Sequence, residues 1–165
     1  MVGTTTRSTR ARRGAWPLGA ILAGTLTFAF TSTTLAAASV GSGEFHPFAA
    51  GTGLSISGRA QMVRTADGKT TVSVHVEGLD PNTTYPAHVH QLPCGTSNAD
   101  GHYRNDPSGP AAPPNEIWPG FTTNDAGIGN GNASVDWTAG QAAVAVVVHA
   151  PDGAKIACAD LVQRP

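Results

Sequence analysis

Short runs of alternating hydrophobic and polar residues, each closed by a turn signal, constrain the fold of this chain more than any other feature. The clearest run is 72–76, where three valines alternate with polar residues, a pattern that predicts a half-buried strand. Similar patterns predict further strands. One begins at Leu54, and the others cover residues 85–91, 133–137, 142–149 and 154–161. No convincing helix is indicated. We therefore predict an all-β fold, a sandwich or Greek-key β-barrel of about eight antiparallel strands.

The composition agrees with one such domain and argues against two other classes of protein. Charged residues make up 13% of the 165 residues, which argues against a disordered, charge-driven tail protein. The formal net charge of −1 provides no basic surface for phosphate groups, so we expect no nucleic-acid partner.

The first 38 residues differ from the rest of the chain and predict a secretory signal peptide, 1–38. They hold four arginines and no acidic residue, followed by the apolar run 16–30 and by Ala36-Ala37-Ala38. The apolar run is shorter than the roughly 20 residues that a membrane span needs, which favours a cleaved signal over a stable membrane anchor. We therefore expect a secreted or extracytoplasmic protein (periplasm or cell envelope), with 39–52 as a flexible lead-in and 53–165 as the folded domain.

The chain has two cysteines, Cys94 and Cys158, and in an exported protein we predict that they form one intrachain disulfide. Closing a loop of this length would restrict the unfolded chain by about 4 kcal/mol on the entropic model. The alternative is a pair of buried thiols that remain unpaired.

Histidines are the sharpest chemical feature of the sequence. His88 and His90 lie on one predicted strand, where alternate residues share a face about 6.6 Å apart, so both imidazoles can reach one metal ion. His102 opens the long loop within residues 95–132, which has no periodicity, and His149 ends the most apolar strand. Four imidazoles favour copper or zinc over calcium or magnesium. The spacing leaves open a surface pair at 88 and 90, or a zinc site like that of hydratases and cupins.

The two remaining histidines are predicted to lie outside such a site. His75 alternates with Val74 and Val76, which places it on the solvent face of its strand. His46 lies in the predicted lead-in, where we expect a solvated side chain, with metal capture by an N-terminal arm as the alternative.

Several of these motifs, in this order, resemble the copper-zinc superoxide dismutase family. They are His88-Val89-His90, Cys94, Asp100-Gly101-His102-Tyr103, Val146-Val147-Val148-His149 and Lys155-Ile156-Ala157-Cys158. The resemblance covers Leu54 to Leu161 and implies an eight-stranded Greek-key β-barrel with a Cys94–Cys158 disulfide. It further implies four copper ligands, His88, His90, His102 and His149.

Two departures from the family pattern resemble its copper-only branch, which lacks zinc. No histidine lies between Tyr103 and Asn132, where the family has further zinc ligands, so we expect copper without zinc. Only eight residues separate His149 from Cys158, where the family has a long charged loop.

The resemblance also implies roles for two other residues. In the copper-only branch a carboxylate orients the bridging histidine, which is His102 here, and Glu116 is our candidate for that carboxylate. The alternative for Glu116 is a solvated acid of the loop. Lys155 stands where the family has an arginine that attracts the anionic substrate, so we expect weaker steering by a point charge.

Taken together, the resemblance implies an enzyme, an exported copper-dependent superoxide dismutase. It would convert superoxide into oxygen and hydrogen peroxide by Cu(II)/Cu(I) cycling, with His102 as the general acid. We expect a monomer or weak homodimer with superoxide as its small-molecule partner. The alternative is a non-enzymatic copper-binding module, for storage or delivery, on the same barrel.

Overall fold

A computed structural model describes residues 1–4 and 37–163 of the chain. The predicted signal peptide, 1–38, therefore lies almost entirely outside the described residues. Within the described part, no helix is long and apolar enough to cross a membrane.

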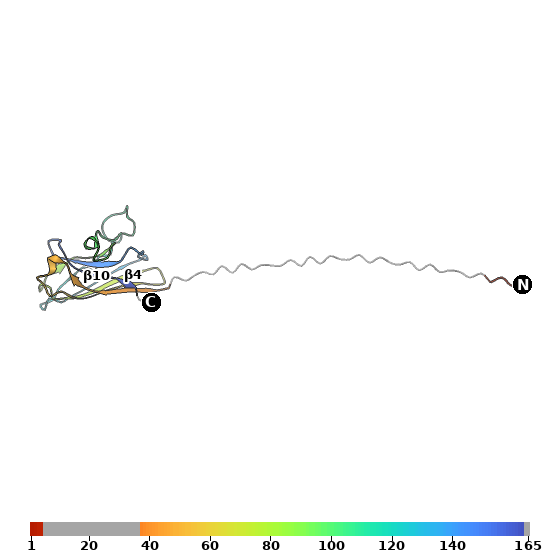
Figure 1. Ribbon diagram of the computed structural model, residues 1–165, viewed down its shortest axis with the longest axis horizontal. Coiled ribbons are helices and arrows are strands. Elements are labelled where there is room, and N and C mark those ends of the chain that lie inside the picture. Colours follow the sequence, from red (N-terminus) through yellow and green to blue (C-terminus); the bar gives the residue numbers. More distant parts are fainter. Residues whose placement is uncertain (5–36, 164–165) are drawn as a thin grey trace. The chain divides into compact units, whose positions relative to one another are not determined.

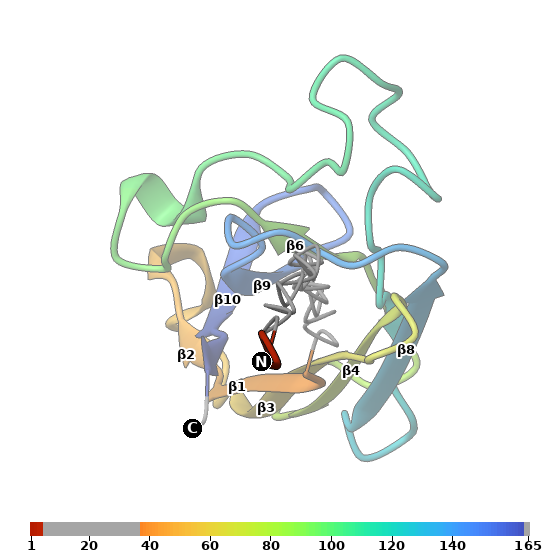
Figure 2. The same cartoon turned by 90° about the vertical axis from the view of Figure 1, so that its right-hand side faces the viewer.

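Two antiparallel β-sheets form the folded domain (Figure 1). Figure 2 shows β1, β3, β4 and β8 on one side of the domain and β2, β6, β9 and β10 on the other. The five-stranded sheet has the order β11 (Val162–Gln163), β1 (Ser39–Glu44), β3 (Ser57–Arg64), β4 (Thr70–Glu77) and β8 (Gly129–Val135). The four-stranded sheet has the order β2 (His46–Pro47), β10 (Lys155–Asp160), β9 (Ala145–His149) and β6 (Ala87–His90).

The remaining elements are short. β5 (Thr84–Tyr85) pairs with β7 (Phe121–Thr122), and Ala49–Gly51 and Ser97–Ala99 form single 3₁₀ turns. Every strand pair is antiparallel, and the described residues contain no α-helix. The predicted all-β antiparallel fold is therefore confirmed.

The hydrophobic core lies between the two sheets and follows the alternation in the sequence. Val72, Val74 and Val76 of β4 are buried, while the polar residues between them face outward or lie partly exposed. In β9 all five residues are buried, so this strand is covered on both faces. The sequence of β9 is thus continuously apolar because both of its faces are covered, whereas β4 alternates because only one of its faces packs into the core.

The segment 39–52 corrects one prediction, because it is not a flexible lead-in. Its first six residues form β1, which pairs with β3 from Ser39 opposite Arg64 to Glu44 opposite Arg59. Its glycines allow close packing of backbones: a Cβ at Gly43 would lie 1.9 Å from the carbonyl oxygen of Asp160. The small residues that resemble a linker in the sequence therefore belong to a tightly packed strand.

A long connection, residues 91–120, rises above β6 (Figure 2). The disulfide Cys94–Cys158 ties its beginning to β10, so the predicted pairing is confirmed. The Cys94 amide also donates to the Asp160 carboxylate at 2.8 Å. These contacts fix the connection to the four-stranded sheet.

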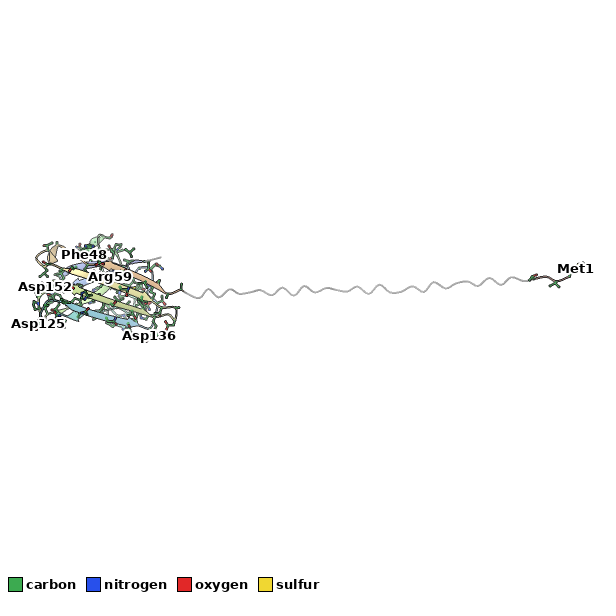
Figure 3. All side chains as sticks on the ribbon, turned by 90° about the horizontal axis from the view of Figure 1, so that it is seen from below. Met1, Phe48, Arg59, Asp125, Asp136 and Asp152 are labelled. Atoms are coloured by element: carbon green, nitrogen blue, oxygen red, sulfur yellow. A yellow bond between two sulfur atoms is a disulfide. The ribbon has the colours of Figure 1, made fainter. Side chains whose placement is uncertain are left out.

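Acidic turns lie at both ends of the domain. Figure 3 shows Asp125 and Asp152 at one end and Asp136 at the other. All three are exposed, and Asp136 forms an ion pair with Lys69, at 3.6 Å. Both ends of the sandwich therefore carry exposed acidic side chains.

Candidate metal centre

The edge strand β6 carries the first two histidines of the cluster. Val89 between them is 1% exposed and points into the core, which turns His88 and His90 to the opposite face. β6 pairs with β9, with Val148 opposite Ala87, and the His149 amide donates to the Pro86 carbonyl at 2.8 Å. The end of β9 is therefore held beside the start of β6.

His102 reaches the same place because the chain turns back along β6 after the disulfide. His90 and His102 form an antiparallel bridge, and the Tyr103 amide donates to the Val89 carbonyl at 2.8 Å. Four histidines from three chain segments thus meet on one face of the sheet.

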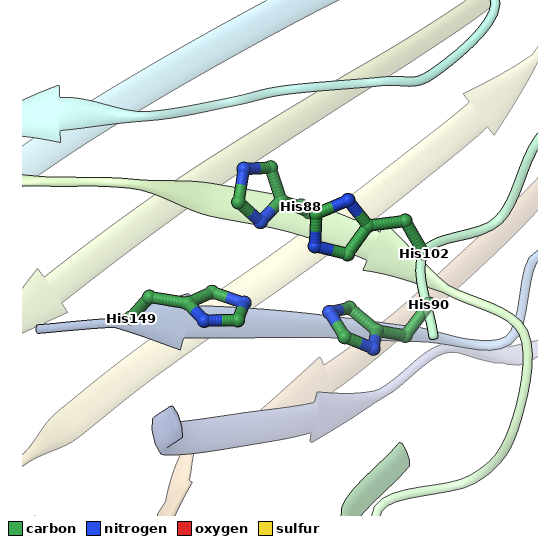
Figure 4. A group of neighbouring side chains, drawn as sticks. All are labelled: His88, His90, His102 and His149. Carbon is green, nitrogen blue, oxygen red and sulfur yellow. The ribbon is translucent and has the colours of Figure 1, made fainter. Parts of the chain in front are cut away.

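The four imidazoles are close enough to share one ion, and Figure 4 shows their rings turned toward a common space. One nitrogen from each ring lies within 4.8 Å of those of the other three. The centroids of the His88 and His102 rings are 3.9 Å apart, and those of His88 and His149 are 4.8 Å apart. Within the described residues, no other group of three or more His, Cys, Asp or Glu side chains has this geometry.

Three ring nitrogens in this space are buried and have no hydrogen-bond partner: His88 Nδ1, His90 Nε2 and His149 Nε2. A buried polar atom without a partner costs free energy, so such atoms usually mark a place where something binds. Imidazole nitrogen is a good ligand for copper and zinc. The donor set therefore fits one such ion.

The opposite ring nitrogens of His90 and His149 are anchored. His90 Nδ1 donates to the carbonyl oxygens of Ala99 and Asp100, at 3.2 and 3.1 Å, and His149 Nδ1 donates to that of Gly153, at 3.1 Å. A proton held on Nδ1 leaves the lone pair on Nε2, the atom that faces the common space. The backbone thereby selects the tautomer that can bind metal.

Burial keeps three of these imidazoles neutral. Desolvation, followed by repulsion from the neighbouring histidines, lowers the pKa of His88 to about 3. Desolvation and the nearby His102 and Lys155 lower the pKa of His90 to about 4, and burial also lowers the pKa of His149. Their lone pairs are therefore free near neutral pH without competition from protons.

Glu116 occupies the outer side of His102. Its Oε2 accepts a hydrogen bond from His102 Nδ1 at 2.7 Å, and the Glu116 side chain is only 2% exposed. The same oxygen accepts a second bond from Trp118 Nε1 at 2.7 Å. Glu116 is therefore a buried carboxylate at the cluster and not a solvated loop acid.

Lys155 is paired with His149 across β9 and β10, beside the cluster. Its Nζ donates to the carbonyl oxygens of Asn98, at 2.8 Å, and Asp100. Two of the three ammonium hydrogens are thus bound to the backbone, and one remains for another acceptor.

Sequence reasoning brought the four histidines, Glu116 and Lys155 to one place, but it missed Trp118. Tryptophan in a proline-rich loop carries no pattern that indicates a metal centre, and only folding places it next to His88. His75 lies on the outer face of β4, and His46 is exposed on β2. Neither belongs to the cluster, as predicted.

Comparisons with known proteins found a match among solved structures, which concerns the fold. No protein-family model matches the chain, and no curated protein matches it. Among solved structures, superoxide dismutase 5 from Candida albicans in its Cu(II) form matches with a TM-score of 0.54 and 17% identity, over 78% of this chain and 94% of that one. A Glu-to-Gln variant of the same protein matches with a TM-score of 0.55 and 16% identity, over the same shares of both chains.

The chain has a superoxide dismutase fold. The predicted resemblance is therefore confirmed at the level of the fold. At this identity the match concerns the backbone, and the chemistry of the site has to be argued from its own residues.

Proposed function

We propose that this chain is an exported copper-dependent superoxide dismutase that works without zinc. The observation that carries the proposal is the set of three buried, unpartnered ring nitrogens that converge with His102. Bound there, copper would supply one-electron chemistry by alternating between Cu(II) and Cu(I), oxidising one superoxide to oxygen and reducing a second to peroxide.

His102 is suited to handle the proton of the reducing half-reaction. Its Nδ1 is occupied by Glu116, so Nε2 is the ring nitrogen left to bind metal or a proton. His102 is also about 30% exposed, whereas His90 and His149 are buried. We propose that Nε2 of His102 takes up a proton when it is not bound to metal and donates it to the peroxide product.

Glu116 holds His102 in the orientation that this role needs. A carboxylate bound to the far nitrogen of a ligand imidazole fixes the tautomer and the ring plane and raises the basicity of the ligand. Here a single buried side chain would provide this support. In this proposal Glu116 takes the place of a second metal behind His102.

Lys155 supplies the positive charge beside the site. Its ammonium is held by two backbone carbonyls, so its position is fixed even though lysine is flexible. A fixed cation draws the anionic substrate and stabilises negative charge on the product. With one hydrogen left, it offers a single donor where arginine would offer a fork, so we expect slower turnover than with arginine.

The disulfide supports the proposed location outside the cytoplasm. Structural disulfides form and persist in oxidising compartments and are rare in the cytosol. The Cys94–Cys158 bond also anchors the connection that carries His102. Export by the predicted signal peptide remains a prediction.

The experiment that tests this function is superoxide decay by pulse radiolysis, on protein loaded with one copper and no zinc. We expect catalytic decay that persists with a zinc chelator present and disappears when copper is removed. A decay that requires added zinc, or that proceeds equally in the copper-free protein, would refute the proposal.

A copper storage or delivery module is the second candidate, and the lysine at position 155 favours it. An ammonium that already donates two hydrogen bonds to backbone carbonyls binds an anionic substrate less strongly. The two functions differ in turnover. Superoxide consumption that stops after one equivalent per copper would identify a carrier, whereas continued consumption identifies an enzyme.

A further inference from the structure

We propose that Trp118 is a positioning residue of the metal centre, which holds Glu116 in place so that His102 stays bound to copper. This inference rests on the copper site of the proposed function, but not on its turnover. Trp118 is 41% exposed, which is unusual for an indole and is not explained by packing into the core. Its contacts explain why it lies there.

The first contact is the hydrogen bond from the indole to Glu116. In the described part of the chain, the Glu116 carboxylate accepts two hydrogen bonds, from His102 Nδ1 and from Trp118 Nε1, both at 2.7 Å. A buried carboxylate needs such donors to offset the loss of hydration. Trp118 therefore supplies half of the direct hydrogen bonding that keeps Glu116 at His102.

The second contact is with a metal-facing histidine itself. The rings of Trp118 and His88 lie edge to face, with centroids 5.1 Å apart and planes at 68°. Trp118 thus touches His88 directly and reaches His102 through Glu116. One side chain braces two of the four imidazoles from the solvent side.

The backbone makes this arrangement rigid. Ile117, between the two residues, is 1% exposed, and its carbonyl accepts a bond from the Val89 amide of β6 at 3.0 Å. With Ile117 inserted in the core, Glu116 and Trp118 both turn toward the cluster. Loss of the indole N–H would leave Glu116 with the hydrogen bond from His102 alone, without unfolding the loop.

The test measures the rate at which copper leaves the full chain and passes to an excess of EDTA. Side chains that support a metal ligand typically change metal affinity by 10- to 100-fold when they are removed. We expect Trp118→Phe, which keeps an aromatic ring but has no N–H, to lose copper about tenfold faster than the unchanged protein.

Trp137→Phe is the matched control. Trp137 is also a partly exposed indole at the edge of the long connection, and its Nε1 donates to the Pro114 carbonyl at 3.0 Å. Its ring contacts that of Tyr103, with centroids 6.2 Å apart. Among the described residues, it forms no aromatic contact with the four histidines. We expect copper loss from this variant at the unchanged rate.

A double-mutant cycle separates positioning from general damage. If Trp118 acts through Glu116, then Trp118→Phe should add nothing to the faster copper loss of Glu116→Ala. Additive effects of the two changes would overturn the proposal. Should Glu116→Ala fail to fold, Glu116→Leu fills the same space without an acceptor and takes its place in the cycle.

Fluorescence gives a second reading that does not depend on activity. Copper(II) quenches a nearby indole strongly, so copper should quench the emission of Trp137→Phe, which retains Trp118, more than that of Trp118→Phe. Equal quenching in both would place Trp118 away from the ion and refute the inference.

The outcomes distinguish this inference from the proposed function. A protein that binds copper but does not turn over superoxide would refute the enzyme and leave Trp118 as the support of a copper carrier. Copper loss that is unchanged by Trp118→Phe would refute the inference alone. A protein that binds no copper at all would refute both.

Discussion

Histidines lie in two different environments in this molecule. One is the candidate metal centre on the four-stranded sheet, and the other is the outer face of the five-stranded sheet. In the histidine cluster of the candidate metal centre, the His90 and His149 rings are buried and the His88 ring is half-buried, and each of the three has one buried nitrogen without a hydrogen-bond partner. On the outer face of the five-stranded sheet, the His75 side chain is 49% exposed. Its Nδ1 contacts Asn130 Oδ1 and its Nε2 contacts Glu77 Oε1, both at 2.9 Å.

The pKa values of the histidines in the two regions move in opposite directions, because one environment disfavours the charged imidazole and the other favours it. Burial without partners lowers the pKa of His88 to about 3, because the charged form cannot be solvated. The hydrogen bonds that the His75 ring donates to Asn130 and Glu77 raise the pKa of His75, because they favour the charged form. A histidine suited to bind metal is therefore distinguished by a buried ring nitrogen without a hydrogen-bond partner, and not by its position on a strand.

The largest effect should follow from removing one ligand of the cluster. We expect His149→Ala to abolish copper-dependent superoxide decay, because the ring nitrogen that faces the ion is lost while the barrel core is retained. His75→Ala should leave the rate unchanged, since that ring lies outside the cluster. Pulse radiolysis measures the rate of superoxide decay with both variants, and circular dichroism checks that each is folded. Full activity in His149→Ala would contradict the copper assignment.

Removal of the disulfide should destabilise the region around the histidine cluster more than the five-stranded sheet. Replacing Cys94 and Cys158 by alanine opens a loop of 64 residues and should lower the free energy of unfolding by about 4 kcal/mol. Hydrogen exchange should then show the greatest loss of protection near residues 91–102. An equal loss in β3 and β4 would mean that the two regions unfold as one unit and would contradict this expectation.

Acid should destabilise the copper-free protein through the cluster. Because the folded pKa values of His88 and His90 lie below the ordinary value near 6.5, the unfolded state binds more protons at intermediate pH. Their contribution is present above pH 6.5 and is lost as the pH falls toward 4 and 3. We expect urea unfolding to show a loss on the order of 3 kcal/mol between pH 6.5 and 5. Constant stability over this range would contradict the burial of these rings.

The smallest effect belongs to His75 and has the opposite sign. Because its folded pKa is raised, its contribution is complete below the ordinary value near 6.5 and is lost as the pH rises through the folded value. The ring is half exposed, so solvent screening should keep this contribution below about 0.5 kcal/mol. Urea unfolding of His75→Gln and the unchanged protein, compared at pH 5.5 and 8, measures it. A greater stabilisation by His75 at pH 8 would contradict the sign.

The alternating runs were sufficient to predict the fold class, because alternation follows directly from the period of a strand between core and solvent. They did not reveal β1. Its sequence, Ser39 to Glu44, has few apolar residues, and its glycines serve a close approach to Asp160 that only the folded chain creates. A linker and a tightly packed glycine strand have similar compositions.

The candidate site divides in the same way. The order and spacing of short motifs pointed to the four histidines and to the two cysteines, because those motifs can be recognised along the chain without knowledge of the fold. Glu116 could be chosen only by resemblance, and Trp118 could not be chosen at all. Both lie in a connection without periodicity, where local sequence says little about which side chains turn inward.

The sequence alone was enough to predict most of the longer strands, the disulfide partners and the set of histidines available to a metal, because these depend on residue type and local pattern. The tertiary structure decided which nitrogens face the common space and which are anchored by backbone carbonyls. It also decided that Glu116 is buried between His102 and Trp118. Those features depend on contacts between distant segments, which form only when the connection 91–120 packs onto the four-stranded sheet.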